Sequence, residues 1–403
     1  MQGRKAYRSL PLFFLLLGSA SAAEDVPLSQ QKQELLKLQR EQAIEQSGTD
    51  KTSWVAPLQF SLSYDKSKSA LGYTNDTKSA LVSWSQDLFR SGGIFYTMDQ
   101  AKASGRANLL AVDRQEASYL KQVYTLKAQV ERDTLKQQQS QLTVKNRDID
   151  LFIVKAKYET GSADIAELNR ATIDRDNAQT ELIIVNNTLR SELFDFKKIA
   201  GDRAVGTVSL PAFPLVDREA YLKDNLELLE YAAQYKADEA SWKVTRSAYL
   251  PTLTFNASYG YGDYEGDMFQ DYDGNQYSYG AVLSMPLDIN SRGTVEVSHL
   301  QALQTKTSES DRRMELMQEY DMRVATIGDY GQKIGVAEQM LKMYEELYDF
   351  TKNQVTAGYK SSFDAESLAN SVQIQKLEKQ IQEYNIMVER ISLYFDTQVY
   401  KEQ

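Results

Sequence analysis

The stretch NQVTAGYKSSFDAE (353–366) closes a tract of about 65 residues without proline that begins at Gly293. An earlier stretch, KYETGSADIAE (157–167), closes a similar tract of about 68 residues that begins at Gly93. At a rise of about 1.5 Å per residue, each tract predicts a helix roughly 100 Å long that ends in a glycine turn, with a second helix returning after it. Such helices are far longer than those of a typical globular domain, so the sequence indicates an elongated helical structure that spans a large distance.

Apolar residues spaced by threes and fours follow the long tracts and their returning arms. The second tract carries Met317, Tyr320, Val324, Ile327, Tyr330, Ile334, Ala337, Leu341, Tyr344 and Tyr348. Its returning arm carries Ile374, Leu377, Ile381, Tyr384, Met387, Ile391 and Tyr394, and the first half carries Leu182, Val185, Leu189, Leu193 and Phe196. This rhythm is typical of helices that pack in a coiled-coil manner. We interpret these side chains as packing residues, not as a cofactor site.

Four segments alternate apolar and polar residues with a period of two, as strands do when their two faces meet different surroundings. The apolar rows run through residues 58–64, 80–84, 253–261 and 277–285. Aromatic residues gather near the strand ends: Trp84, Phe89, Tyr249, Tyr259, Tyr261, Tyr277 and Tyr279. This pattern favours membrane-spanning strands over the alternative, two amphipathic hairpins of a soluble sandwich.

Four strands cannot close a barrel, and an open edge in lipid leaves backbone groups unpaired. Several chains must therefore share one barrel. Because outer-membrane barrels begin at about eight strands, two chains are the minimum and three chains give twelve strands.

The first 22 residues predict an export signal, because Arg4, Lys5 and Arg8 precede the apolar run 10–17 and small residues follow at 20–22. We expect the mature chain to begin near Ala23, without disulfides, since the sequence contains no cysteine. Without the three basic signal residues, 43 Lys and Arg stand against 56 Asp and Glu, a net charge of −13. That balance argues against binding to nucleic acid. No later apolar run approaches the 18 residues of a transmembrane helix.

The pattern divides the mature chain into two copies of one unit. The first repeat, 23–202, is expected to hold a helix at about 28–46, a β-hairpin at 57–87, a long helix at 93–160, a tip at 161 and a return helix at 163–200. The second repeat, 217–403, is expected to hold a helix at 217–247, a hairpin at 250–287, a long helix at 293–357, a tip at 358 and a return helix at 362–401. Between them lies the linker 203–216, where Pro211 and Pro214 exclude a helix.

The duplicated halves, hairpins, signal peptide and glycine tips together resemble the TolC family of outer-membrane efflux and secretion channels. The strand-to-helix junctions SQDLFRSGG (85–93) and SMPLDINSRG (284–293) are similar to the family's Ser-x-Pro-Leu-Phe-x-x-Gly pattern. Asp87 stands where the first junction would have proline, and Asp288 stands where the second would have an aromatic residue.

This resemblance implies a mainly α fold with a β part. A long, coiled-coil-like α-helical barrel would cross the periplasm, and four transmembrane β-strands per chain would contribute to a shared trimeric β-barrel in the outer membrane of a Gram-negative bacterium. It implies a homotrimer that contacts outer-membrane lipid. It also implies a periplasmic adaptor protein that meets the tips and an inner-membrane pump of RND or ABC type. The function expected is passive export of small molecules or proteins.

The tips hold the candidate gate. The two repeats align on Gly161 and Gly358, and six residues further on they place Glu167 and Asp364. The resemblance implies that Asp364 lines the narrowest part of the entrance and that Lys360 helps to hold it closed. The family pattern has a second acidic residue nine positions after the glycine. In this chain Ser367 stands at that position, with Glu366 beside it.

Two acids of the first tip are also candidate gate residues. Glu167 is a possible ion-pair partner for Lys360, and Asp164 completes the set. The alternative is helix capping, because Ser361-x-x-Asp364 is a capping-box pattern and because Asp164 and Glu167 stand near a helix start. We expect Gly161 and Gly358 to be left-handed turn residues.

Adaptor contact is expected at the two turns, with Tyr158 and Val355 beside them. The matched lengths of the two tracts predict that both turns lie at one depth. The second tip is the better gate candidate because it carries Lys360 and Asp364, and the first tip supplies a partner acid.

Asp263, Glu265, Asp267, Asp271 and Asp273 are expected in a solvated loop, 262–276, that contains no base. Binding of divalent ions there is the sharper alternative. His299 is the sole histidine, and no triad, phosphate loop or metal-ligand pattern surrounds it, so we predict neither catalysis nor a cofactor or metal. Two further functions stay open, a periplasmic adaptor protein and a structural coiled-coil spacer.

Overall fold

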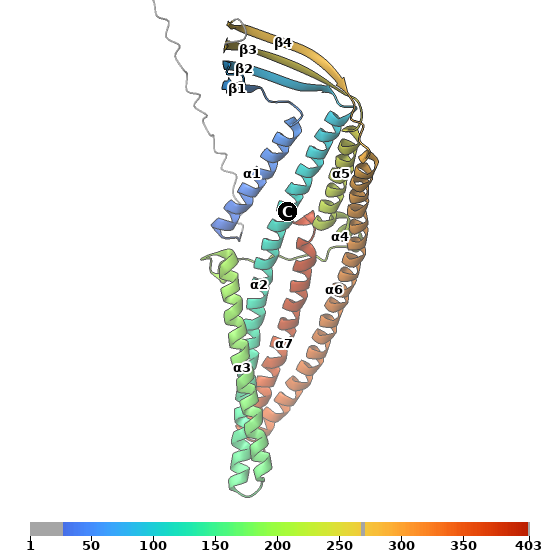
Figure 1. Cartoon of the computed structure of the whole chain (residues 1–403). Coiled ribbons are helices and arrows are strands. Elements are labelled where there is room, and N and C mark those ends of the chain that lie inside the picture. The colour runs from blue at the N-terminus through green and yellow to red at the C-terminus, as the bar shows by residue number, and fades with distance from the viewer. Residues whose placement is uncertain (1–26, 267–270, 402–403) are drawn as a thin grey trace, which may run out of the picture.

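The computed structural model describes residues 27–266 and 271–401, so the predicted signal peptide and Asp267 lie outside the described residues. The molecule is long, with a β-sheet at one end and helices that extend from it (Figure 1). In chain order the elements are α1 (Gln30–Thr52), β1 (Gln59–Lys68), β2 (Thr74–Phe89), α2 (Gly93–Glu159), α3 (Ile165–Ala200), the short 3-10 helix η1 (Val205–Thr207), α4 (Arg218–Asp224), α5 (Leu226–Ser247), β3 (Thr252–Gly266), β4 (Tyr272–Ser284), α6 (Ser291–Thr356), α7 (Ser362–Phe395) and the short 3-10 helix η2 (Gln398–Lys401).

The two proline-free tracts form α2, with 67 residues, and α6, with 66 residues. The shorter helices join end to end into two further rows: α1 with α3, and α5 with α7. The start of α1 lies at the end of α3, where the Ser29 amide donates to the Ile199 carbonyl at 2.9 Å. In the same way α5 begins where α7 ends, because the Leu226 amide donates to the Asp396 carbonyl at 3.0 Å.

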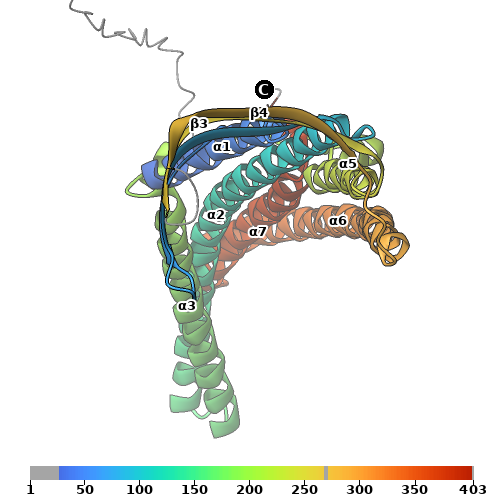
Figure 2. The same cartoon turned by 45° about the horizontal axis from the view of Figure 1, so that its top comes forward.

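These junctions produce four parallel rows in the order α1/α3, α2, α5/α7, α6. Figure 2 shows the rows as an arc. The arc leaves α1 and α3 at one edge and α6 at the other.

The predicted single helix 217–247 is wrong, because Asn225 interrupts it. Asn225 has an extended backbone (φ −63°, ψ 122°), and its side-chain oxygen accepts from the Glu227 amide at 3.0 Å and the Leu228 amide at 3.3 Å. Asparagine is favoured at this N-cap position because its side chain satisfies amides that have no partner within the helix. The residue is fully buried and bridges Thr397.

Three helix ends also differ from the predictions. The first helix continues to Thr52, beyond the expected end at 46, and the last ends at Phe395, before the expected 401. Residues 396–397 leave the helix to pair with the start of α5, which competes with helical continuation. The first return helix begins at Ile165, with Asp164 as its N-cap.

The apolar core lies at the level where α5 and α7 meet. One cluster joins Phe213 and Val216 of the linker to Tyr320 of α6 and to Ile391 and Phe395 of α7. The linker is further fixed by the Tyr320 hydroxyl, which donates to the Val216 carbonyl at 2.9 Å. A second cluster, which includes Val123 and Phe196, joins α2 to the α1/α3 row. These clusters hold the four rows together at mid-length.

The sheet is antiparallel in the order β1-β2-β3-β4, which confirms a mainly helical fold with a four-stranded part. The central pair β2 and β3 joins the two halves of the chain, with Val82 opposite Tyr259 and Trp84 opposite Ala257. Each outer strand has one edge without a hydrogen-bonded neighbour strand in the described chain. Apolar side chains of these strands are solvent-exposed, Phe60 by 68% and Tyr279 by 77%.

The expected loop 262–276 is mostly strand, since β3 reaches Gly266 and β4 begins at Tyr272. In the described residues, no helix is long and apolar enough to cross a membrane.

Candidate functional site

The first tip is a tight turn between α2 and α3. Gly161 has φ +75°, a left-handed conformation that glycine adopts at little cost, and the Ser162 amide donates back to the Lys157 carbonyl at 2.7 Å. Asp164 caps α3, since its side chain accepts from the Glu167 amide at 2.8 Å. Glu167 is exposed. Asp164 therefore has the capping role that was one of its two interpretations.

The second tip repeats this geometry with a fuller cap. Gly358 has φ +78°, and the Tyr359 amide donates to the Gln354 carbonyl at 2.9 Å. Ser361 accepts from the Asp364 amide at 3.4 Å, and Asp364 accepts from the Ser361 amide at 3.1 Å, which forms a complete capping box. Only one oxygen of Asp364 takes part, so the same carboxylate still carries a charge beside the turn.

The single chain does not join Lys360 to Glu167. Among the described residues, no ion pair involves Lys360, Glu167 or Glu366, and all three are exposed. Val355 is half-buried and Tyr158 is exposed at the other tip. A Lys360 latch, if it forms, needs a partner on another chain.

The prediction that both turns lie at one depth is wrong. Phe152 of α2 stacks on Phe363 of α7, with ring centroids 5.1 Å apart, and Asn146 donates to the Ser367 carbonyl at 3.2 Å. From the ring contact, α2 continues for nine residues to Gly161, whereas α7 is only five residues from Gly358. The first tip therefore extends beyond the second by about four residues, or about 6 Å.

A groove of about 340 Å³ lies between α2 and α3 just above the first tip. It places Glu167 near three basic residues that the sequence analysis did not single out, Arg147, Lys157 and Arg170. Arg175 pairs nearby with Asp148 at 3.5 Å and Asp176 at 3.1 Å. The first tip is thus a mixed-charge surface. From the sequence alone, the only signal for this surface is that charged residues are spaced by three or four positions on the two helices that flank the glycine turn.

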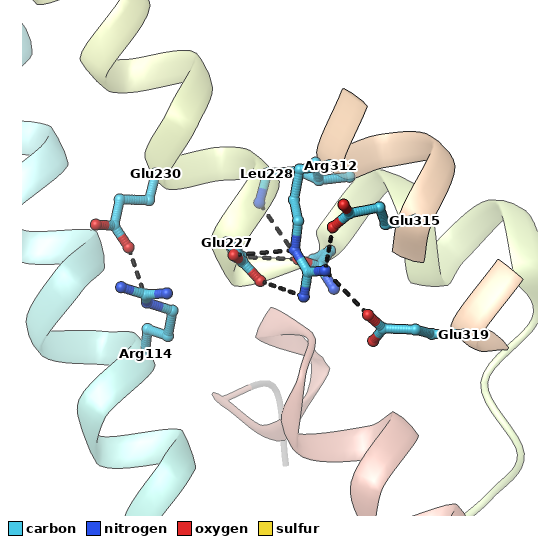
Figure 3. A network of polar contacts seen from close by, with 8 residues as sticks. Arg114, Glu227, Leu228, Glu230, Arg312, Glu315 and Glu319 are labelled. Carbon is cyan, nitrogen blue, oxygen red and sulfur yellow. Dashed lines mark hydrogen bonds and ion pairs between the residues drawn. The ribbon is translucent and has the colours of Figure 1, made fainter. Parts of the chain in front are cut away.

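A cavity of about 820 Å³ lies where the four rows meet at mid-length. Arg312 of α6 reaches Glu227 of α5 at 3.1 Å, Glu315 at 2.7 Å and Glu319 at 2.9 Å, while Arg114 reaches Glu230 at 2.9 Å (Figure 3). The three carboxylates around Arg312 raise the pKa of its guanidinium, chiefly through the hydrogen bond to Glu227. This network ties α5 to α6 and α2.

This network was not predicted from the sequence, because its links between helices, Arg312 to Glu227 and Arg114 to Glu230, join residues at least 85 apart, and each looks like an ordinary solvated helix residue. The linker side chain Phe213 packs on Tyr124 of α2, whereas the cavity meets Lys121 and Thr125 of the same helix. At 100° per residue Lys121 and Thr125 lie only about 60° and 100° around α2 from Tyr124, so the cavity adjoins the apolar core.

A second buried polar cluster lies between α2, α3 and α7. The Arg132 guanidinium contacts Asp133 at 2.6 Å, Glu192 at 3.4 Å and the Asn385 amide oxygen at 3.4 Å. Side chains of Asp133 and Glu192 are only 4% and 12% exposed. Desolvation, together with the neighbouring Asp133 carboxylate, raises the pKa of Glu192 to about 7, although Arg132 and Lys136 oppose the shift.

The acidic strand ends do not form a metal cluster. In the described residues, no group of three or more His, Cys, Asp or Glu side chains could hold a metal ion. The segment itself contains no base, but the fold supplies one from the neighbouring strand, because Lys78 of β2 pairs with Asp263 at 3.1 Å. Asp273 accepts from the Tyr261 hydroxyl at 3.1 Å, and Asp271 accepts from the Gly266 amide at 3.2 Å.

Residues 218–394 match the family model "Outer membrane efflux protein". No curated protein sequence gives a significant match. Solved structures with the same fold include the outer membrane protein VceC from Vibrio cholerae, with a TM-score of 0.71, 14% identity and coverage of 91% of this chain and 92% of that chain.

Two channel structures are also similar. The Campylobacter jejuni CmeC outer membrane channel has a TM-score of 0.72 at 14% identity, with 92% of this chain and 84% of that chain covered. The open-state Neisseria gonorrhoeae MtrE outer membrane channel has a TM-score of 0.66 at 12% identity, with 90% and 84% covered.

Residues 218–394 are thus similar to the outer membrane efflux protein family, and the fold is similar to solved outer-membrane channels, as the resemblance to TolC-like channels predicted.

The raised pKa of Glu192 predicts a pH-dependent stability. Because the folded protein holds this proton more tightly than the unfolded chain, stability is highest below the ordinary pKa near 4.5 and falls as pH rises toward 7. Glu192→Gln should remove this loss, so the variant should exceed the wild type by about 2 kcal/mol at pH 8 and match it near pH 4.5. Thermal unfolding followed by circular dichroism at both pH values measures the difference.

Glu181→Gln is the matched control, since Glu181 is an exposed residue of the same helix and should change nothing. Equal pH dependence in the wild type and Glu192→Gln would contradict the assignment.

Proposed function

We propose that three copies of the chain form one continuous duct, with a twelve-stranded barrel in the outer membrane and a helical tunnel below it. The single observation that carries this proposal is the pair of free edges at β1 and β4 in an antiparallel sheet with an open apolar face. A lipid-exposed edge would cost several kcal/mol per unpaired backbone group, whereas edge-to-edge contact between chains satisfies these groups. Three chains supply an even number of strands within the range of outer-membrane barrels.

The helical layer supports the same assembly. Its two outermost rows expose apolar stripes that no other part of the described chain covers. On α3 these residues are Ile165, Ile173, Ile183, Ile184 and Phe194, and on α6 they are Met314, Met322, Val336, Met343, Leu347 and Phe350. Packing of α6 from one chain on α1 and α3 of the next would bury both stripes and close the arc of Figure 2 into a tube.

The duct would work passively, as the exit component of a tripartite efflux pump or a type I secretion system. Its tips would meet a periplasmic adaptor protein, which would connect them to an inner-membrane pump of RND or ABC type. Small molecules or proteins would leave through the tunnel, and the second tip, with Asp364 and Lys360, would act as the gate. Three copies of Asp364 near one axis would repel one another and attract cations.

Assembly and conduction can be measured directly. The protein should require detergent for extraction from membranes, migrate as a trimer, and conduct ions across planar lipid bilayers. Release by osmotic shock would instead support the periplasmic adaptor alternative. A trimer without conductance would support the structural spacer, and a stable soluble monomer would overturn the shared barrel.

Charge and capping at Asp364 can be separated by two substitutions. Asp364→Asn keeps a side-chain oxygen for the Ser361 amide but removes the charge, so it should reduce cation preference and raise single-channel conductance. Ser361→Ala removes the cap acceptor and keeps the charge, so it should lower stability by about 1 kcal/mol and leave ion preference unchanged. Reversal potentials in a salt gradient distinguish the two. Unchanged selectivity and conductance in Asp364→Asn would exclude the gate role.

Adaptor contact at the tips predicts site-specific crosslinks. The chain has no cysteine, so single substitutions Tyr158→Cys and Val355→Cys can carry a photo-reactive label at each tip. Each should capture the same periplasmic protein in cells. Glu296→Cys, an exposed position near the sheet end of α6, is the control and should not capture it. Capture from Glu296 alone would contradict docking at the tips.

A further inference from the structure

The two free edges of the sheet carry opposite charges at the same end. On β1, Lys66 and Lys68 stand at the end of the strand that lies farthest from the helices. On β4, Asp271 and Asp273 stand at that same end, where the strand begins. All four side chains are exposed. One edge of the sheet is therefore basic at the level where the other edge is acidic.

These charges lie on the face of the sheet that carries the exposed apolar residues. Alternate residues of a strand point to the same face. The two lysines of β1 therefore share the face of Phe60, and the two aspartates of β4 share the face of Tyr277. The register carries that face across all four strands. Asp65, between the apolar positions of β1, points to the other face and does not cancel the basic edge.

The chain itself leaves these charges incompletely paired. Lys66 contacts Asp76 of β2 at 3.0 Å, whereas Lys68 takes part in no ion pair among the described residues. Asp273 takes part in none within the described chain either, and it lies directly opposite the like charge of Asp263. Like charges that face each other on neighbouring strands are destabilising. The acidic edge therefore favours a base on its open side.

A second copy of the chain can supply the missing charges. Because the sheet has four antiparallel strands, β4 of one copy and β1 of the next would continue the antiparallel alternation. This β4–β1 contact is the seam between copies. With the helices of both copies on one side, the basic end of β1 meets the acidic end of β4. The same contact can repeat until a ring closes.

Side chains select the register of the seam. Backbone hydrogen bonds form at any register, but a shift by one residue turns the apolar side chains to the wrong face, so only shifts of two residues compete. With Lys66 opposite Asp273, Lys68 falls opposite Asp271, and both lysines face an acid. A shift of two residues in either direction leaves only one lysine opposite an acid.

The apolar residues fit the same register. It places Phe60 opposite Tyr279 and Leu62 opposite Tyr277, all of which are exposed in the single chain. Apolar and aromatic pairs across neighbouring strands stabilise a sheet. The whole of β1 then has a partner, since Gln59–Lys68 faces residues 271–280.

We propose that Lys66 and Lys68 on β1 of one copy form ion pairs with Asp273 and Asp271 on β4 of the next, and that these pairs set the register at which copies join. A lysine ammonium has three donors, so Lys66 can keep Asp76 while it binds Asp273. The inference rests on the shared barrel proposed above, but it concerns the seam and can fail while the barrel stands.

Cysteine crosslinking reads the register, since the chain has no cysteine of its own. After oxidation of the assembled protein, Leu62→Cys with Tyr277→Cys should give covalent trimers on non-reducing gels. Within one chain these strands are three spacings apart, about 14 Å, so the disulfide can form only between copies.

Leu62→Cys with Tyr279→Cys is the matched control, because it is shifted by two residues on the same face. It should crosslink at least about tenfold more slowly, since the two positions would be about 8 Å apart. If the first pair does not assemble, Phe60→Cys with Tyr279→Cys reads the same register.

Charge exchange tests the ion pairs in the Leu62→Cys, Tyr277→Cys background. Lys68→Glu should slow crosslinking at least about threefold, because it places two acids across the seam. Adding Asp271→Lys reverses both charges and should restore the rate to within about twofold. Lys145→Glu, at an exposed position of α2 far from the sheet, is the control and should leave the rate unchanged.

Faster crosslinking of the shifted pair would overturn the register. An unchanged rate in Lys68→Glu would overturn the ion pairs. So would a slow rate that Asp271→Lys does not restore, which is the result expected if the lysines bind lipid headgroups instead. Trimers joined at another register would leave the shared barrel standing, whereas wild-type protein that forms no trimer would contradict both the barrel and the seam.

Discussion

Unpaired backbone groups at the two edges of the sheet are the constraint on which the rest of this architecture depends. A helix satisfies its amides and carbonyls internally, but β1 and β4 each leave one side without a partner in the described chain. The central β2–β3 pair joins the two halves, so one free edge comes from each half. Only a few residues separate β2 from α2 and β4 from α6. Closing the sheet between chains therefore brings the outer helical rows together as well.

The mid-length junction makes four rows from six principal helices. Asn225 ends one helix and caps the next while it bridges Thr397, which follows the end of α7 by two residues. The linker adds Phe213, which packs on Tyr124 of α2 and on Phe395 of α7. The cavity beside the Arg312 network is lined by Leu316 and Phe395 of the same apolar core. Apolar packing and paired charges therefore hold the rows together at the same level.

The sequence predicted the elements with strong periodicity and missed those that depend on contacts between distant segments. Long helices, strands and tip turns follow from local spacing, glycine and proline, and Ser361 with Asp364 formed the expected capping box. The break at Asn225 was missed because an apolar rhythm continues through it. It is explained only by the bridge from Asn225 to Thr397 and by the Leu226 amide, which donates to the Asp396 carbonyl.

The candidate site shows the same limit. Arg132 and Glu192 belong to different helices, and neither differs locally from a solvated helix residue. Lys78 and Asp263 become partners only through the register of β2 against β3. The roles of Asp364, Lys360 and Glu167 depend on neighbouring chains and stay predictions.

The unequal reach of the two tips sets the symmetry of the end face. With three chains around one axis, six turns would alternate between a forward and a recessed position about 6 Å apart. The rim would be notched, not level. A binding ring of six identical, rigid subunits would meet two kinds of seat and could not use the same contact at all six. A ring of three pairs of subunits would match the alternating rim. The offset between the two tips therefore restricts which subunit arrangements a protein bound at this end can have.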